Sequence, residues 1–257
     1  TKINGGIKIK GVLGRQRKYF TKSDGIVRGV DIEWSANELI PILNKKGIIT
    51  SFGASFVSKF QRGFDPILNL PENVGSYSLR SNLNFKGYSW TNEWAYKIND
   101  PSYDNGYIYR PGEAFISTLT YSKKGLGILA SIKRIDNMSF RSDRNAQQFD
   151  LFINFLPPTS EPHTYALPAL YPYATQVNGE IGGQFEISYM IPRGSPLGGK
   201  YGTRLNFNSA ISNSIDKSVL EDGTRGLKGT QGYISDYLKL GPIRYFQDLN
   251  ASISHKF

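Results

Sequence analysis

Apolar and polar side chains alternate with a period of two in one segment after another of this chain. Between Tyr77 and Phe85 nearly every odd position is apolar, while the even positions are serine, arginine and asparagine. Successive side chains of a β-strand point to opposite faces, so this pattern predicts a strand with one apolar and one polar face. The segment from Trp90 to Ile98 repeats the pattern, and the Gly87-Tyr88 pair before it predicts a tight hairpin.

About eleven segments alternate in this way, so the chain is predicted to be all-β and antiparallel. Each is about nine to eleven residues long, the length that crosses a bilayer at a tilt of ~45°. One helical turn is predicted, over residues 37–44. The alternating positions that identify these strands lie within residues 7–10, 30–34, 48–59, 77–85, 90–98, 115–121, 126–132, 149–155, 185–191, 201–207 and 243–253.

Two architectures satisfy this pattern. One is a soluble antiparallel sandwich or barrel with its apolar faces inward, and the other is an outer-membrane β-barrel with apolar faces toward lipid and polar faces toward the lumen. The strands exceed the ~5–6 residues typical of soluble sheets, which favours the membrane barrel. Large aromatics also recur near strand ends, where an interfacial girdle would place them. The expected girdle consists of Trp34, Trp90, Trp94, Tyr96, Tyr121, Tyr189 and Tyr201.

Charged residues recur on the predicted polar faces, which a barrel would turn toward its lumen. Salt-bridged packing inside the lumen and a weakly anion-preferring pore explain these charges equally well. Arg28 is an exception, because it falls on the apolar register and must then lie near an interface. The expected lumen-facing charges are Lys8, Lys10, Asp31, Glu33, Arg80, Lys86, Glu93, Lys97, Asp150, Glu186 and Arg204.

The strand count and the loop lengths are irregular for a complete barrel. Bacterial single-chain barrels normally have an even number of strands, so an odd count predicts a missed strand or a chain that is part of a larger barrel. Phe257 is a candidate for a C-terminal assembly signal. The predicted strand order puts the long connections after Leu156 and Ser212 on the same side as the tight turns, which leaves the orientation open.

The composition of the 257 residues narrows the chemistry. The absence of cysteine excludes disulfides, thiolate metal sites and a cysteine nucleophile, and two histidines leave little room for a histidine-rich site. The net charge of +10 is spread along the chain without a recognition helix or a base-stacking motif, so no nucleic-acid partner is predicted. No apolar run reaches ~18 residues, which excludes a transmembrane helix. The length fits a single β domain over residues 1–257.

Three short patterns have ordinary explanations beside a chemical one. Gly194, Gly199 and Lys200 have phosphate-loop spacing, but Tyr201 follows where serine or threonine is required, so a hairpin loop is predicted. Residues 100–105 have the chemistry of a turn, with a surface calcium ion as the alternative. His163 is predicted to pack in its loop rather than to act as a catalytic base. No catalytic residue, metal ligand or cofactor is predicted, and the protein is not expected to be an enzyme.

Five stretches carry a resemblance to a known family. They are residues 149–157, 163–167, 172–176, 179–182 and 191–203. Together they resemble an uncharacterised family of Bacteroidota outer-membrane β-barrel proteins whose members are longer than this chain. The resemblance implies a barrel fold, an outer-membrane location and a chain that is a piece of a longer member. By association it also implies contact with other envelope proteins, as in type IX secretion, gliding or nutrient-uptake machinery.

The sequence therefore favours an outer-membrane β-barrel in contact with outer-membrane lipid. Such a protein would act as a subunit of a larger envelope complex or as a passive pore. The alternative is a soluble all-β binding protein, which explains the alternation but not the strand lengths or the aromatic positions.

Overall fold

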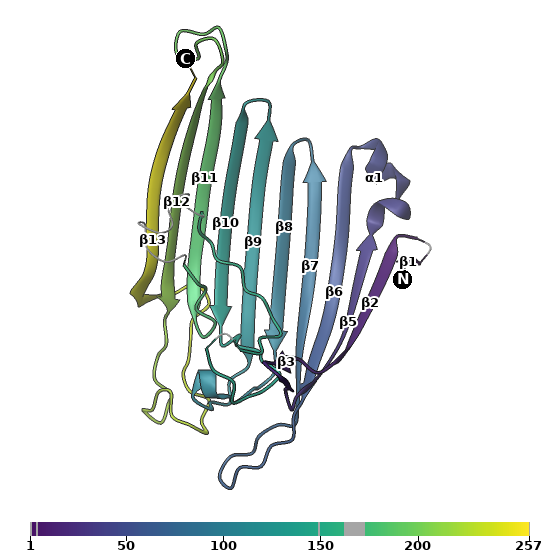
Figure 1. Ribbon diagram of the computed structural model, residues 1–257, viewed down its shortest axis with the longest axis vertical. Helices are drawn as coiled ribbons and strands as arrows, with labels where there is room; N and C mark the ends of the chain where they lie inside the picture. The colour runs from purple at the N-terminus through teal and green to yellow at the C-terminus, as the bar shows by residue number, and fades with distance from the viewer. Residues whose placement is uncertain (1, 4, 149, 162–172, 257) are drawn as a thin grey trace.

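The computed structural model describes residues 2–3, 5–148, 150–161 and 173–256. Ten long antiparallel strands and the two-residue β1 form one meandering sheet in the order β1-β2-β5-β6-β7-β8-β9-β10-β11-β12-β13, and β3 and β4 form a separate hairpin (Figure 1). The elements are β1 (Lys2–Ile3), β2 (Ile7–Gly14), β3 (Arg17–Lys18), β4 (Thr21–Lys22), β5 (Ile26–Ser35), η1 (Ala36–Glu38), α1 (Pro41–Lys45), β6 (Ile48–Phe60), β7 (Asn73–Phe85), β8 (Tyr88–Lys97), η2 (Tyr103–Asn105), β9 (Gly112–Lys123), β10 (Leu126–Asp136), β11 (Glu180–Ile191), β12 (Thr203–Ile215) and β13 (Leu240–His255). The prediction of an all-β antiparallel chain is confirmed.

The two faces of the sheet differ in chemistry, as the alternation predicts. Residues directly opposite each other in an antiparallel pair share a face, so the register assigns every strand position. Leu83, Trp90 and Leu119 form one row of what we call the apolar face, and Asn82, Thr91 and Thr118 form the adjacent row of the polar face. The apolar face continues from β2 to β13.

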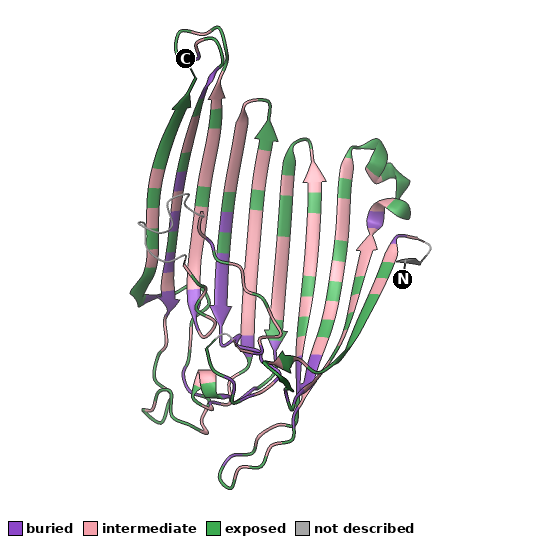
Figure 2. Cartoon of the chain, viewed as in Figure 1, coloured by how far each residue is buried: buried purple, intermediate pink, exposed green. Residues whose placement is uncertain are grey.

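The apolar face is not covered over most of its height. Leu79, Ile132 and Leu249 retain 57%, 59% and 67% of their accessible surface. Buried residues gather instead at the lower strand ends in Figure 2, where loops pack against the sheet. One small hydrophobic cluster there joins Ile108, Ile215 and Tyr233.

The connections differ in length between the two ends of the sheet. The tight turns Lys86-Gly87 and Lys124-Gly125 lie at the upper end in Figure 1, which we call the short-turn end. The two longest connections, between β10 and β11 and between β12 and β13, leave and re-enter the sheet at the opposite end, which we call the long-loop end. The expectation that the long connections share a side with the tight turns is therefore wrong.

A strand predicted from the sequence but not formed accounts for that error. Residues 150–155 contain no strand, and Phe149 lies outside the described residues. The backbone at Leu151 has a φ of +59°, which no strand adopts, and Phe152 makes only an isolated bridge to Arg141. Removing this strand reverses the direction of every later one. Asp150 therefore lies in an irregular segment, and its assignment to a lumen-facing strand is wrong.

The other predicted elements form, with small shifts at their ends. The helical turn over residues 37–44 is present as η1 and α1. Lys86, expected on the polar face, lies in the β7–β8 turn, where its φ of +46° and that of Gly87 at +86° give the backbone a hairpin turn requires. Its assignment to the lumen-facing set is therefore wrong, because the strand ends at Phe85.

The sheet remains open in the described part of the chain. The β1–β2 pair forms one edge and β13 forms the other, with no pairing between the two edges. A closed barrel is therefore not present in this structure. None of the described helices is long and apolar enough to cross a membrane.

Candidate functional site

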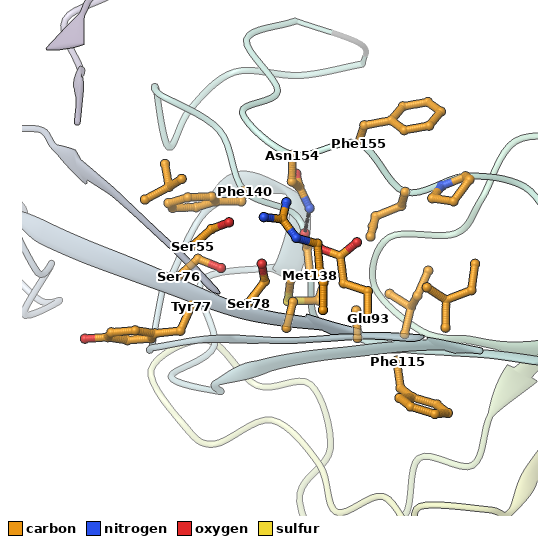
Figure 3. Close-up of a pocket in the computed structure, with 18 of the residues that line it drawn as sticks. Ser55, Ser76, Tyr77, Ser78, Glu93, Phe115, Met138, Phe140, Asn154 and Phe155 are labelled. Atoms are coloured by element: carbon orange, nitrogen blue, oxygen red, sulfur yellow. Dashed lines mark hydrogen bonds between the residues drawn. The ribbon is translucent and has the colours of Figure 1, made fainter. Parts of the chain in front are cut away.

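A segment of the long β10–β11 connection lies across the polar face near the long-loop end. We call residues 138–157 the cover, with Phe149 left out of the description. A cavity of about 260 Å³ lies between the cover and the polar face of β6 to β10. Figure 3 shows Ser55, Ser78 and Glu93 on the sheet side of this cavity, with Phe140 and Asn154 of the cover above them. Near the long-loop end, the chain's own residues therefore cover the polar face.

Buried ion pairs hold the loops against the sheet. Lys59 on β6 lies 2.8 Å from the Asp100 carboxylate in the β8–β9 connection, and both side chains are almost fully buried. Lys97 on β8, also buried, lies 3.9 Å from the same carboxylate and donates a hydrogen bond to the Ser139 carbonyl of the cover. One carboxylate therefore balances two lysines, and one of these lysines binds the cover directly.

A second buried pair anchors the far end of the cover. The Lys133 ammonium on β10 lies 2.7 Å from the Glu180 carboxylate at the start of β11. It also donates to the Pro157 carbonyl at 2.8 Å and to the Thr175 hydroxyl at 3.0 Å. Tyr173 donates its hydroxyl proton to Glu180, and burial together with this carboxylate raises the tyrosine's pKa.

Two arginines fix the turn inside the cover. The Arg141 guanidinium lies 2.6 Å from Asp104, stacks 3.7 Å from the centre of the Phe152 ring and donates to the Gln147, Gln148 and Asp150 carbonyls. Arg144 donates from its guanidinium to the Gln61 and Pro71 carbonyls. Carbonyl groups of an irregular segment need such donors when water is excluded, so these arginines replace the ladder that a strand would supply.

The β2–β5 connection also contacts the cover. Gln16 donates its side-chain amide to the Phe152 carbonyl at 2.8 Å, and the Ser23 and Ser142 hydroxyls lie 3.0 Å apart. Gly25 approaches so closely that a Cβ there would lie 1.7 Å from the Ser142 carbonyl oxygen. Contacts from the first loop of the sheet thus complete the attachment of the cover.

The cavity has one apolar wall and one mixed wall. The cover contributes mainly apolar side chains, including Met138, Phe140 and Ile153. The sheet contributes Ser55, Ser76, Ser78, Arg80, Glu93 and Lys133, together with Val57, Ala95, Ala114, Ile116 and Ile135. This combination of apolar surface and a few polar groups is typical of a small-molecule binding site, although the volume is near the lower limit of such sites.

Farther toward the short-turn end, a polar cluster continues from the cavity lining, to which its members Ser55 and Arg80 belong. The Asp31 carboxylate accepts hydrogen bonds from the Arg80 guanidinium and, at 2.7 Å, from the Ser55 hydroxyl. Lys10 lies 3.9 Å from the same carboxylate and is largely exposed. Charges of opposite sign on β2, β5 and β7 are thus paired across the polar face.

A third cluster lies in the loops of the long-loop end. Arg110 forms an ion pair with Asp136 at 2.6 Å, and Tyr233 donates its hydroxyl proton to the same carboxylate. Burial and the Asp136 charge raise the pKa of Tyr233. Lys217 lies 4.5 Å from the centre of the Tyr233 ring, and burial lowers the pKa of its ammonium group. These contacts join the β12–β13 connection to the ends of β9 and β10.

Most of the expected lumen-facing charges lie on the polar face. Lys8 pairs in register with Glu33, and Arg80 pairs with Glu93. Two expected members, Lys86 and Asp150, lie outside the strands, as described above. The members that the register places on the polar face are Lys8, Lys10, Asp31, Glu33, Arg80, Glu93, Lys97, Glu186 and Arg204. Whether that face lines a lumen stays a prediction.

All but one of the expected girdle residues lie on the apolar face, and the exception is Tyr201. The register places Trp34, Trp90, Trp94, Tyr96, Tyr121 and Tyr189 on the apolar face. Tyr121 contacts Tyr88 near the short-turn end, with ring centres 4.5 Å apart, and Trp94 stacks with Tyr96 near the long-loop end. Tyr201 precedes β12 and lies in the β11–β12 connection instead. Their location at a membrane interface stays a prediction.

Sequence reasoning missed the buried pairs. Lys59, Lys133 and Glu180 are on strands that the alternation predicts or extends, but Asp100 and the cover come from connections with no periodic pattern. The one available signal was a lysine followed by an acidic loop, as in Lys97 and Asp100. Such a pair is common on solvated surfaces, so it does not identify a buried contact.

The calcium and phosphate-loop candidates of the sequence have other structural roles. Asp100 and Asp104 are paired with lysine and arginine side chains rather than grouped around a vacant centre. Among the described residues, no group of three His, Cys, Asp or Glu side chains is arranged to hold a metal ion. Residues 194–199 form turns before β12, with Gly194 and Gly199 at positive φ. His163 and Phe257 lie outside the described residues.

Comparison with known proteins assigns a family without an activity. Searches of the curated proteins and of the solved structures gave no match. One family model matches, and it covers residues 1–257. The chain therefore belongs to a family of unknown function, DUF6029.

Proposed function

We propose that this chain forms part of the wall of an outer-membrane β-barrel in a Bacteroidota-type bacterium and works there as a subunit of a larger envelope complex. The observation that carries the proposal is the continuous, uncovered apolar face of the ten long strands. In water, soluble monomers rarely expose an apolar patch larger than a few hundred Å². Lipid is a solvent in which such a face is favourable.

The height of the apolar face fits a bilayer. On β7 it extends over the nine residues from Tyr77 to Phe85. At about 3.3 Å per residue this is about 30 Å along the strand, and at a tilt of about 40° it gives about 23 Å of height, close to the ~25 Å band of outer-membrane barrels. Charges on this face lie near strand ends, with Arg28, Glu113 and Arg134 at the long-loop end and Lys123 at the short-turn end.

The difference between the two ends also supports the proposal. Outer-membrane barrels have short periplasmic turns and longer extracellular loops. The turns at Lys86-Gly87 and Lys124-Gly125 then face the periplasm, and the β10–β11 and β12–β13 connections begin and end on the outer side. The loop clusters around Asp100 and Asp136 would lie on the extracellular side.

The open edges favour a subunit over an isolated barrel. Unpaired backbone groups at β2 and β13 would each cost several kcal/mol in hydrocarbon. Closure therefore requires further strands, from the rest of a longer chain or from another subunit. The cover also blocks part of the polar face, which argues against a wide, open passive pore. The partly exposed charges around Asp31 and Arg80 are the observation that favours the pore as the second candidate.

The proposal is tested on protein recovered from the outer-membrane fraction. A closed barrel resists unfolding in SDS, so we expect gel mobility to change on boiling. Mild-detergent extraction should give a complex with a stoichiometric partner and little stepwise conductance in planar bilayers. Recovery as a soluble protein, without a mobility change, would favour the soluble all-β binding protein instead. Extraction as a lone barrel with stepwise conductance would favour the passive pore.

A further inference from the structure

The cavity under the cover contains one carboxylate that no residue of the described chain neutralises. Glu93 on β8 lines this cavity and has neither a hydrogen-bond partner nor an ion-pair partner among the described residues. Its register neighbour Arg80 directs its guanidinium to Asp31. Lys133, the other cation in the wall, is paired with Glu180. Both cations of the lining are therefore paired with carboxylates outside it, and Glu93 is left as the unpaired charge.

A second polar atom in the same cavity lacks a partner. The Asn154 side chain donates from Nδ2 to the Met138 carbonyl at 2.7 Å, which fixes the orientation of its amide. Its Oδ1 atom is buried and accepts no hydrogen bond from the described residues. Asn154 belongs to the cover and Glu93 to the sheet, and Figure 3 shows the two on opposite walls of the cavity. Two acceptors without donors therefore lie on opposite sides of one space.

The remaining lining is chiefly apolar. Ile116 and Ile135 from the sheet and Phe140 and Ile153 from the cover supply this surface. At about 30 Å³ for each water-sized group, the 260 Å³ cavity has room for about nine such groups. The occupant that matches is therefore small, carries hydrogen-bond donors and one positive charge, and has a compact apolar body.

We propose that this cavity binds a small amphipathic primary amine, with its ammonium group donating to Glu93 and its apolar part against Phe140 and Ile153. An ammonium group offers three donors, and it can satisfy Glu93 together with Asn154 Oδ1. A neutral alcohol of the same shape lacks the charge, and a carboxylate would be repelled by Glu93. The inference does not rest on the membrane location, because the groups that it uses come from the cover and from the polar face of the sheet.

The test uses 2-phenylethylamine as the probe, with calorimetric titration of the folded protein in detergent micelles. Its neutral analogue 2-phenylethanol and the anion 3-phenylpropionate should bind at least tenfold more weakly, because hydrogen bonds to charged groups contribute about 10- to 100-fold in affinity. This comparison uses the unaltered protein and needs no variant to fold.

Two variants then locate the binding. Glu93→Gln should weaken amine binding at least tenfold. Glu186→Gln removes a charge from the same face outside the cavity lining and should change the affinity by less than twofold. Micelles take up the amine equally in all samples, so the difference reports the site. The proposal is overturned if the amine does not bind the unaltered protein at millimolar concentration, if alcohol and amine bind equally, or if the Glu93→Gln protein keeps full affinity.

Discussion

The carboxylate of Asp100 lies 2.8 Å from the ammonium group of Lys59, and each side chain retains only 1% of its accessible surface. This pair joins the β8–β9 connection to β6, two strands away in the sheet. Lys97 shares the same carboxylate and reaches the cover through the Ser139 carbonyl. One carboxylate in a loop therefore binds lysines on two strands, and one of these lysines also binds the cover.

Replacing Asp100 with alanine should destabilise the fold by about 3–5 kcal/mol, because two buried lysines lose their shared counter-ion. Denaturant titration of the folded fraction measures the loss. The matched control is Asp24→Ala, which removes an exposed carboxylate and should change the free energy of unfolding by less than about 0.5 kcal/mol. Equal effects of the two substitutions would show that the buried pair does not stabilise the fold.

A charge introduced on the apolar face should act differently from the same charge on the polar face. Leu119→Arg places a cation near the middle of the apolar face and should cost about 2–4 kcal/mol if that face contacts lipid. Thr91→Arg, on an exposed position of the polar face of the neighbouring strand, should cost less than about 1 kcal/mol. The two variants are compared by urea titration in lipid bilayers. A larger cost for Thr91→Arg would reverse the assignment of the faces.

Arg141 is expected to control the order of the cover. Its guanidinium satisfies three backbone carbonyls and an aspartate, so Arg141→Ala leaves the turn around Gln148 without donors. Chymotrypsin should then cleave near Phe152 at least tenfold faster than in the unaltered protein. Arg62→Ala, an exposed arginine in another loop, serves as the control and should leave the cleavage rate unchanged. Unchanged cleavage of the Arg141→Ala protein would mean that other contacts are enough to keep the cover ordered.

Tyr233 predicts a dependence of stability on alkaline pH. Burial and Asp136 raise its pKa in the folded protein above the ordinary value of about 10. Its contribution to stability is therefore complete below about pH 10 and is lost as the pH rises toward the folded-state pKa. Tyr233→Phe should make the decline above pH 10 shallower, as measured by thermal unfolding at stepped pH.

The control for this prediction is Tyr19→Phe, because the Tyr19 side chain is 78% exposed. It should leave the alkaline decline unchanged. An identical decline in the Tyr233→Phe protein would contradict the role assigned to this tyrosine.

The alternation of side chains predicts the sheet well, because each strand has one face in a different environment from the other. Ten of the eleven predicted strands form. The pattern around Phe152 is also alternating, but there it reflects one side of an irregular segment packed over the sheet. Periodicity indicates only that one side of a segment is buried. It does not show whether the segment pairs within a sheet or packs across the face of one.

The buried ion pairs and the cavity could not be predicted from local sequence. Lys59 and Asp100 are 41 residues apart, and Lys133 and Glu180 are separated by the whole β10–β11 connection. Only the fold of the irregular connections brings these side chains together. Glu93 was identified from its polar register, but its lack of a partner depends on the direction of the Arg80 guanidinium.

The central claim, that the apolar face contacts lipid, is tested most directly by tryptophan fluorescence. The chain has three tryptophans, Trp34, Trp90 and Trp94, and all lie on that face. In bilayers of brominated phospholipid we predict strong quenching of their emission and little quenching by aqueous iodide. Strong quenching by iodide, with emission unaffected by brominated lipid, would contradict the account and place the apolar face against protein or water.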